Sequence, residues 1–567
     1  MDFSTLTAAV AAQSLLMTGS IWDSLEIFQT ESWKNVMNAL RISLTLGGAL
    51  LLMYEYRARR MGQPVRERTQ KRVAFVLAAL AFCAYFDFFN PKVRYPEYYH
   101  RHELFHYYLG SKYNKELGYT RIYECSAIAE VELGRGAQIR KRELRDLREN
   151  LIKPIPDTYV FSNPGRCKKH FTPEKWEAFK KDVDWFQHAS RGSYWENMHK
   201  DHGYNPPPVW TMAGKFFGSF APAGDGFFKL LAAIDPVLQL GAVLLVWWAF
   251  GWKIMAITTV FWGCNAPANF YWTGGAFLRQ DWIFLLVAAL AFAKKRKFGL
   301  AGAALTWSAL LRVFPLIMFA GWGILVGMHL IRHRRFHPDH RRLVIGCVMA
   351  AGILIPASVI ATGGANTYYE FYNHTLRTHQ TTPLTNHMGL ETMVVHNWDG
   401  RMRFTRNNNL DDPFQGWKDG RNERFKKARP LFLAIVLGLF AWTVWALRRT
   451  KLMWVALPLS LPLTMALTNL TCYYYSMFMV AGALVAVRPT FGPAFLAASG
   501  ASQILLLKYY FVDDKYTAQS WLFFLLAILI LVVYSRPFSR ERLKAWWEGK
   551  REPRPKNAPP PTALTTG

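Results

Sequence analysis

The sequence predicts an all-α polytopic membrane protein, a bundle of about thirteen transmembrane helices with a large helical loop outside the cytoplasm. Two observations predict it. Apolar runs of about 20 residues, the length that crosses a bilayer, recur along the chain. Lys and Arg gather at the ends of these runs. The averages alone, 51% hydrophobic residues and a mean hydropathy of +0.02, would also suit a large soluble protein.

The net charge of +29 would favour nucleic acid as a partner if the protein were soluble. Here the basic residues instead form dense clusters between apolar runs, the pattern that orients membrane proteins. The clusters are 57–72, 294–297, 332–342 and 448–449. Alternating the spans places every cluster in the cytoplasm, with the N-terminus outside and the C-terminus inside. We therefore expect no nucleic acid partner and a multi-pass protein of a bacterial inner or plasma membrane.

The predicted organisation follows from these spans. In order, they are 36–56, 73–90, 229–250, 254–270, 281–293, 298–311, 314–331, 343–361, 431–447, 452–469, 470–487, 490–507 and 521–534. The segments are 1–35 (interfacial), 36–90 (two spans), 91–228 (large outer loop), 229–361 (spans), 362–429 (second outer loop), 430–535 (spans) and 536–567 (basic, Pro-rich cytoplasmic tail). Long loops escape the positive-inside bias, so the basic residues of the outer loops do not conflict with this topology.

The large loop is long enough to fold on the membrane surface. We expect helices at 103–117, 138–151 and 173–188, broken by Pro and Gly. Cys125 and Cys167 share this loop, and an oxidising compartment would permit a disulfide between them. Two unrelated thiols fit the sequence equally well, because it gives no distance. The other four cysteines lie in or beside predicted spans as buried apolar residues.

The most reactive-looking segment of the loop contains His102-Glu103-Leu104-Phe105-His106. On a helix, this H-E-x-x-H pattern places two imidazoles one turn apart beside a carboxylate, as a zinc protease requires. No acidic motif downstream stands out as a third metal ligand. The segment also suits an aromatic, His-rich helix that lies in the membrane interface.

The same segment resembles the first outer loop of the GT-C membrane glycosyltransferases, and of glycosyltransferase family 87 in particular. The residues that carry this resemblance are Glu103, Tyr107, Tyr108, Gly110, Gly118 and Tyr123. Further matches are the runs 274–280 (GGAFLRQ), 299–302 (GLAG), 311–315 (LRVFP), 205–208 (NPPP) and 386–390 (NHMGL). Two departures keep the charge, since the family more often has Asp at Glu103 and Lys at Arg312. The resemblance implies a GT-C-like bundle and covers about 87–507.

The resemblance also implies the chemistry, in which a sugar moves from a polyprenyl phosphate to an acceptor hydroxyl. Glu103 would be the base for that hydroxyl. Asp87 is an alternative base, although it would also fit as a carboxylate at a helix end in water. The residues implied in binding the donor phosphate or sugar are Arg312, Arg279, Gln280, His102, His106 and Tyr107. Asn386, His387 and Asn205 would line the acceptor side of the site. Several of these also read as helix caps, polar turns or interfacial histidines.

The implied partners are a polyprenyl-phosphate-linked sugar, membrane lipid, and a glycan or lipid acceptor. The sugar would be a mannose-like hexose or a pentose, and no cofactor is expected other than a divalent cation. Two other classes of function remain open. A membrane metallohydrolase would use His102 and His106 as zinc ligands, and a transporter or non-catalytic scaffold would need no base. No internal repeat of the kind common in transporters is evident.

Overall fold

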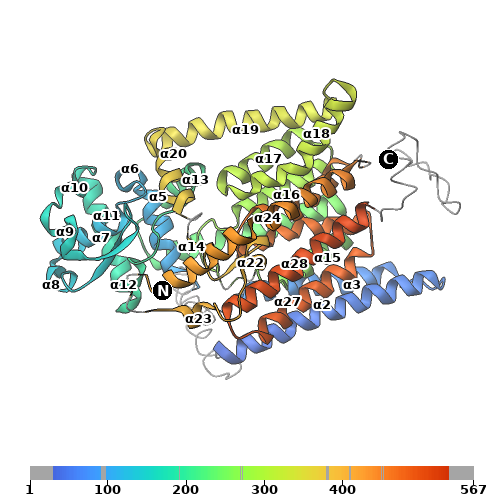
Figure 1. Cartoon of the computed structure of the whole chain (residues 1–567), viewed down its shortest axis with the longest axis horizontal. Coiled ribbons are helices and arrows are strands. Elements are labelled where there is room, and N and C mark those ends of the chain that lie inside the picture. Colours follow the sequence, from blue (N-terminus) through green and yellow to red (C-terminus); the bar gives the residue numbers. More distant parts are fainter. Residues whose placement is uncertain are drawn as a thin grey trace, which may run out of the picture.

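The computed structural model describes residues 30–90, 98–190, 192–268, 270, 272–378, 382–407, 410, 412–448, 450 and 452–535. The tail 536–567 and almost all of the predicted interfacial segment 1–35 lie outside these residues. Figure 1 shows a large bundle of long helices with a smaller domain of short helices at one end, which we call the outer domain.

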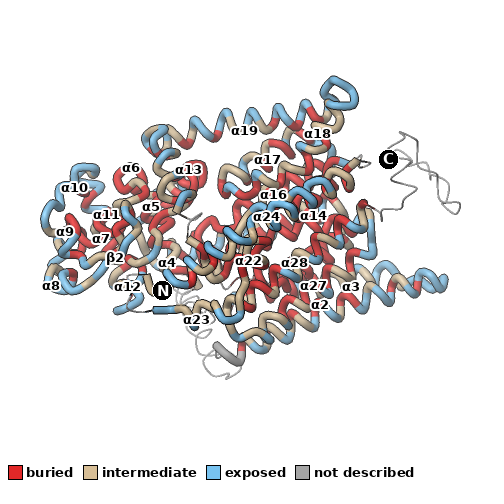
Figure 2. The backbone as a smooth tube through the Cα atoms, in the orientation of Figure 1, coloured by how far each residue is buried: buried red, intermediate tan, exposed pale blue. Residues whose placement is uncertain are grey.

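Among the residues that the structure describes, six helical stretches of the bundle are long and apolar enough to cross a membrane. They are α2 (Thr30–Arg60), α14 (Asp225–Phe250), η6 (Phe314–Phe319) with α18 (Ala320–His333), α19 (Pro338–Thr362), α24 (Gln415–Leu447) and α28 (Val512–Ser535). The α19 helix shows why they suit a bilayer, because Val348, Ile353 and Ile360 leave 65%, 63% and 76% of their surface uncovered (Figure 2). An apolar face of this kind needs a lipid or protein partner. The chain thus has the architecture of an all-α membrane protein.

The other bundle elements are shorter. They are α3 (Glu67–Tyr85), η2 (Asp87–Phe89), α15 (Trp252–Gly263), α16 (Asp281–Lys294), α17 (Phe298–Leu311), α25 (Met453–Ala456), η8 (Pro458–Ser460), α26 (Leu461–Leu467), η9 (Cys472–Ala486) and α27 (Phe491–Lys508). The prediction of about thirteen spans therefore remains a prediction for these segments.

The basic turns lie at the end of the bundle away from the outer domain (Figure 1). Arg296, after α16, pairs with Asp339 at the start of α19 (3.3 Å), so these two turns are neighbours. Figure 1 shows the connection between α2 and α3 and the end of α28 at this same end. The bundle thus has a basic end and an end that carries the outer domain.

The outer domain is built from short elements around an aromatic core. They are α4 (Arg101–Leu104), η3 (Phe105–Leu109), α5 (Gly110–Lys112), α6 (Asn114–Leu117), α7 (Ile122–Glu130), η4 (Val131–Arg135), α8 (Gly136–Ile139), β1 (Glu143–Asp146), β2 (Leu151–Pro154), η5 (Ile155–Asp157), α9 (Tyr159–Ser162), α10 (Gly165–Lys168), α11 (Pro173–Ala189), α12 (Ser193–Met198) and α13 (Pro208–Gly218).

Two of the three helices predicted in this loop are confirmed, as the helical run 101–117 and as α11. The predicted helix 138–151 is wrong, because β1 and β2 form an antiparallel hairpin there. Within β1, Leu144 and Asp146 are buried while Glu143 and Arg145 are not, which is the period of a strand. Asn150 adopts a φ of +61° in the turn, a conformation that Asn tolerates well.

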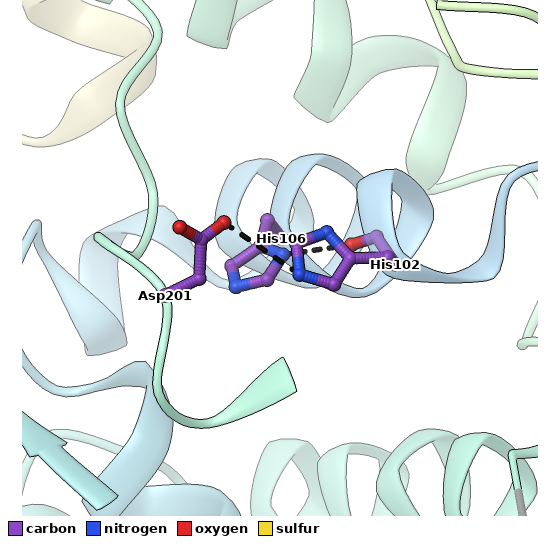
Figure 3. A group of neighbouring side chains, drawn as sticks. All are labelled: His102, His106 and Asp201. Atoms are coloured by element: carbon purple, nitrogen blue, oxygen red, sulfur yellow. Dashed lines mark hydrogen bonds and ion pairs between the residues drawn. The ribbon is translucent and has the colours of Figure 1, made fainter. Parts of the chain in front are cut away.

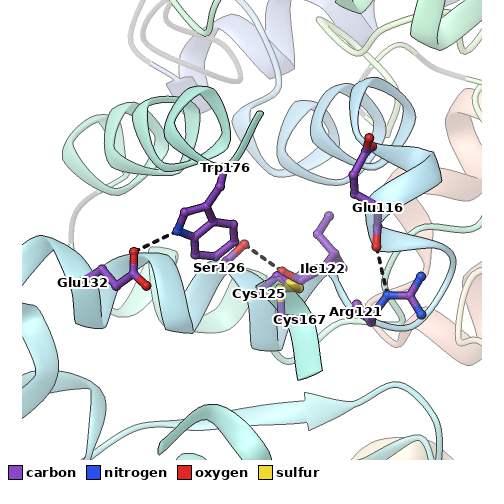
Figure 4. Close-up of a disulfide and its surroundings, with 8 residues drawn as sticks. All are labelled: Glu116, Arg121, Ile122, Cys125, Ser126, Glu132, Cys167 and Trp176. Carbon is purple, nitrogen blue, oxygen red and sulfur yellow. Dashed lines mark hydrogen bonds between the residues drawn. A yellow bond between two sulfur atoms is a disulfide. The ribbon is translucent and has the colours of Figure 1, made fainter. Parts of the chain in front are cut away.

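A disulfide joins two helices of the outer domain. Cys125 of α7 is bonded to Cys167 of α10 across 42 residues, with Cα atoms 5.7 Å apart (Figure 4). Nearby, the Trp176 indole of α11 donates to Glu132 at 2.8 Å. The disulfide closes a loop that contains the β-hairpin.

The outer domain docks on the non-helical segment between α15 and α16. The His100 amide donates to the Gly275 carbonyl (2.7 Å), and the Trp210 indole of α13 donates to the Leu278 carbonyl (2.8 Å). Gly275 has a φ of +71°, and a Cβ there would lie 2.6 Å from the Tyr98 oxygen. Only glycine permits this approach without strain.

The segment predicted as a second outer loop contains α20 (Asn366–Phe371), η7 (Tyr372–Leu376), β3 (His387–Met388), α22 (Leu390–Val395) and α23 (Met402–Thr405). β3 pairs with β4 (Leu470–Thr471) in an antiparallel bridge. α24 already begins at Gln415 and continues into the span that was predicted from 431. The loop is therefore tied to the bundle at both of these points.

Candidate functional site

The helical segment 101–109 presents four of the candidate residues, His102, Glu103, His106 and Tyr107. The His100 side chain accepts a hydrogen bond from the Glu103 amide (3.3 Å), which caps the first turn of α4. In such a turn, residues four apart share a face. Glu103 and Tyr107 therefore form one face, and His102 and His106 form another.

The Glu103 face meets Arg279 of the bundle. Arg279 Nε lies 3.3 Å from Glu103 Oε2, and the two side chains are 7% and 17% exposed. The same guanidinium donates to the Tyr107 hydroxyl and to the Tyr473 hydroxyl (3.2 Å). Arg279 thus joins a carboxylate and a phenol of the outer domain to a phenol of η9.

The Glu103 carboxylate is held by charge but is not saturated with hydrogen bonds. Oε2 is buried and has no hydrogen-bond partner among the described residues, although it stands within ion-pair distance of Arg279. A buried oxygen without a donor costs free energy, on the order of 1–3 kcal/mol. Such an atom is suited to accept a proton or a hydrogen bond from a bound molecule.

Asp235 of α14 fixes the position of Arg279. Its carboxylate accepts hydrogen bonds from the Arg279 amide (3.0 and 3.1 Å) and from the Gln280 amide (3.1 Å). The Gln280 side chain accepts from Gln239 (2.9 Å) and donates to Thr273 (3.1 Å). Gln280 therefore anchors the segment that carries Arg279, and these contacts preorganise the site.

Arg312 lies beside this cluster as a buried cation, 7% exposed. Its guanidinium donates to the carbonyls of Leu311 (2.7 Å) and Leu278 (3.3 Å) and lies 5.9 Å from the centre of a Trp210 ring. Among the described residues, no carboxylate oxygen lies within 4.0 Å of it. The Asp281 carboxylate acts on this guanidinium electrostatically from farther away. A buried guanidinium that no carboxylate contacts directly is a candidate anion site.

The three residues predicted on the acceptor side lie at two places. Asn205 Oδ1 accepts a hydrogen bond from the Tyr107 hydroxyl (2.8 Å), so Asn205 belongs to the Glu103 face. His387 pairs with Thr471, and the Asn386 carbonyl accepts from the Cys472 amide (2.9 Å). Asn386 and His387 thus flank the strand that leads into Tyr473.

Asp87, the alternative base, is placed in the first helical hairpin. Its carboxylate pairs with Arg41 of α2 at 2.6 Å, and both side chains are mostly buried. It is held by Arg41 rather than by Arg279 or Arg312. The ion pair with Arg41 therefore favours a structural role for the Asp87 carboxylate.

The other face of segment 101–109 gathers His102, His106 and Asp201 (Figure 3). One potential ligand atom from each residue lies within 4.8 Å of the others. His102 Nε2 is 3.6 Å from Asp201 Oδ2. Burial, with the neighbouring His102 next in importance, lowers the pKa of His106 to about 4, so its imidazole is neutral at pH 7.

The sequence analysis missed Asp201, Asp235 and Trp210. Asp235 could have been identified from the sequence, because an ionisable residue inside a predicted span indicates a partner or a function. Asp201 gave none, since it is far from His102 along the chain and meets it only in the fold.

A scan against models of known protein families, a search of curated proteins and a search of solved structures each found no match to this chain.

Proposed function

We propose that this chain is an integral membrane glycosyltransferase of the GT-C type, similar to glycosyltransferase family 87. It would move a sugar from a polyprenyl phosphate to an acceptor hydroxyl on the outer side of the membrane. One observation carries the proposal. Glu103, with its unsatisfied buried oxygen, lies in one cluster with Arg279, and the guanidinium of Arg312, which no described carboxylate contacts within 4.0 Å, lies next to it.

In the proposed reaction, the acceptor hydroxyl attacks the anomeric carbon of the sugar. Glu103 takes the hydroxyl proton as the new C–O bond forms. The bond between the anomeric carbon and the phosphate oxygen breaks, and its electron pair leaves with the polyprenyl phosphate. A single displacement of this kind inverts the anomeric centre. A positioned base contributes about 10²- to 10⁴-fold to such a rate.

The two arginines have different roles in this proposal. Arg312 binds the leaving phosphate, because its fork has no carboxylate to hold and can grip two phosphate oxygens. Arg279 is a positioning residue, since its guanidinium is already occupied by Glu103, Tyr107 and Tyr473. Tyr107 in turn places Asn205 at the site.

We further propose that the outer domain faces the periplasm or cell exterior of a bacterium, with the N-terminus outside and the C-terminus inside. The basic turns at the opposite end of the bundle support this orientation. The disulfide supports it as well, since disulfides persist in oxidising compartments.

The purified full-length protein, in detergent or nanodiscs, would be incubated with a panel of polyprenyl-phosphate hexoses and pentoses. Release of polyprenyl phosphate, together with a glycosylated acceptor, supports the proposal. Folded protein that releases none from any donor contradicts it and leaves the transporter or scaffold hypothesis in its place.

A metallohydrolase is the second candidate, because Asp201 supplies the third ligand that the sequence did not reveal. Against it, the Glu103 carboxylate of the H-E-x-x-H pattern pairs with Arg279 of the bundle. A hydrolase of this type needs that carboxylate at the metal-bound water. Zinc-dependent peptide hydrolysis that is lost in Glu103→Gln would favour this second candidate.

A further inference from the structure

We infer that His102, His106 and Asp201 form a binding site for a divalent metal ion of the zinc class, inside the outer domain. The ion would hold the segment around Asp201 against the helical segment 101–109. This inference does not depend on the proposed function, because its three ligands include neither Glu103, Arg279 nor Arg312.

The spacing of the three residues fits a zinc ion. In a tetrahedral site with ligands at about 2.0–2.1 Å, ligand atoms lie about 3.3 Å from one another. The separation of 3.6 Å between His102 Nε2 and Asp201 Oδ2 is close to this value, and all three atoms lie within 4.8 Å. Side-chain rotations of His102, His106 and Asp201 would bring the three atoms closer around one ion.

The hydrogen bonds of His106 select the nitrogen that would bind. The His102 carbonyl can only accept, so the contact at 2.7 Å places the proton on His106 Nδ1. Nε2 is then the nitrogen with a free electron pair, and it accepts from the Tyr123 hydroxyl at 2.6 Å. A backbone carbonyl that orients the far nitrogen is the usual outer partner of a metal-binding histidine.

Tyr123 and the metal would compete for the same electron pair. When the metal binds, the Tyr123 hydroxyl has to release His106 Nε2. The Tyr123 oxygen lies 2.6 Å from Nε2, and a zinc ion would stand about 2.0–2.1 Å from the same nitrogen. The exchange therefore requires the His106 ring to turn away from Tyr123, whose oxygen also accepts from the Gly203 amide (3.0 Å).

The ligand set also fits the metal class. Two neutral imidazoles and one carboxylate are common ligands of zinc, with a fourth position left to water or another ligand. His102 and His106 stand on one helical turn, and Asp201 comes from the loop after α12. Asp201 is followed by Asn205, which the Tyr107 hydroxyl contacts. A metal here would thus fasten the loop that carries one proposed site residue.

The test uses the full-length protein, stripped with a chelator and titrated with Zn²⁺ or Co²⁺. Four histidines at the basic end, His329, His333, His337 and His340, have several ring centroids 4.5 to 5.5 Å apart and would compete for metal. The titration is therefore done in a background that carries His333→Asn and His337→Asn. Metal content, calorimetry and the visible spectrum of bound Co²⁺ are measured.

We expect about one zinc per chain in this background. His102→Asn and Asp201→Asn, both at partly exposed positions, should weaken binding by more than about 100-fold, since losing only an outer partner weakens it about 10- to 100-fold. His188→Asn is the matched control, because His188 also lies beside an aspartate of the outer domain but is 66% exposed. It should bind zinc like the background.

A second measurement guards against variants that merely misfold. Added Zn²⁺ should raise the apparent unfolding temperature of the background protein and of His188→Asn, but not that of folded Asp201→Asn. A background protein that binds no zinc would overturn the inference. Equal zinc binding by the background, His102→Asn and Asp201→Asn would overturn it too.

Discussion

The two faces of segment 101–109 differ in what they contact. The face with Glu103 and Tyr107 meets Arg279 and so connects the outer domain to the bundle. The face with His102 and His106 meets Asp201 and Tyr123 and stays within the outer domain. One short helical stretch thus serves the chemistry we propose on one side and the fold of its own domain on the other.

This difference separates two interpretations of segment 102–106, a catalytic carboxylate and a metal site, that the sequence alone did not distinguish. An H-E-x-x-H pattern suggests one site in which the carboxylate and the imidazoles act together. In the fold, the carboxylate has an arginine partner from a distant segment, while the imidazoles have an aspartate. Variants on the two faces should therefore have separable effects.

The largest expected effect is on the Glu103 face. Glu103→Gln should lower the rate of sugar transfer by about 10²- to 10⁴-fold, because the amide cannot take the proton. Its zinc content should be unchanged. Transfer is measured as release of polyprenyl phosphate, and Glu177→Gln, an exposed carboxylate on α11, is the control. Transfer by Glu103→Gln at the normal rate would remove Glu103 as the base.

The next effect concerns the stability of the domain that holds the histidine face. Replacing Cys125 and Cys167 by Ser should cost about 4 kcal/mol for a closed loop of this length, in the chain-entropy account. Thermal unfolding and limited proteolysis would report it. Cys83→Ser, which breaks no disulfide, is the control. If the double variant unfolds like the native chain, the disulfide does not stabilise the outer domain.

A smaller effect is expected from the bundle side of the site. Arg312→Gln should lower kcat/KM for the donor by about 10²- to 10³-fold, as for loss of one preorganised donor. Arg312→Lys should lose less, since it keeps the charge but not the planar fork. Arg296→Gln, at the exposed basic end, should transfer normally. Equal losses in Arg312→Gln and Arg312→Lys would mean that a positive charge without the planar fork does not support transfer.

The smallest effect tests the contact between the two parts. Gly275→Ala should destabilise the protein by about 1–3 kcal/mol, because the new methyl meets Tyr98 and Tyr99 in a left-handed conformation. Gly134→Ala has a similar positive φ but open space around it, so it isolates the backbone strain. Unfolding temperatures of the two variants would be compared. A loss no greater in Gly275→Ala than in Gly134→Ala would mean that the close approach is unimportant.

The helical membrane class was predictable from the sequence, because apolar runs of spanning length recur along it. The two outer loops were derived from the spacing of those runs and the alternation of the basic clusters, and their placement outside the membrane stays a prediction. The helix predicted at 138–151 is wrong because the segment forms a β-hairpin. The alternating burial of β1, with Leu144 on the buried face, depends on the packing of that hairpin. In the sequence alone, the charged residues of 138–151 favour a solvent-exposed helix.

The site was predictable only in part. Glu103 and Arg279 were named from a family resemblance, and the fold places them together. Asp235, which accepts from the Arg279 amide, and Asp201, which pairs with His102, lie far along the chain from the residues they contact. Proximity of this kind depends on tertiary contacts and has no local pattern in the sequence.

Asp235 has a consequence for how the protein is made. A carboxylate in the middle of a spanning helix costs about 2.5–3.5 kcal/mol to insert, and the amides that receive it belong to a segment synthesised after α15. During biogenesis α14 therefore enters the membrane before its partners exist. We expect a chain truncated after α15 to insert α14 poorly, and insertion to recover when synthesis continues past Gln280.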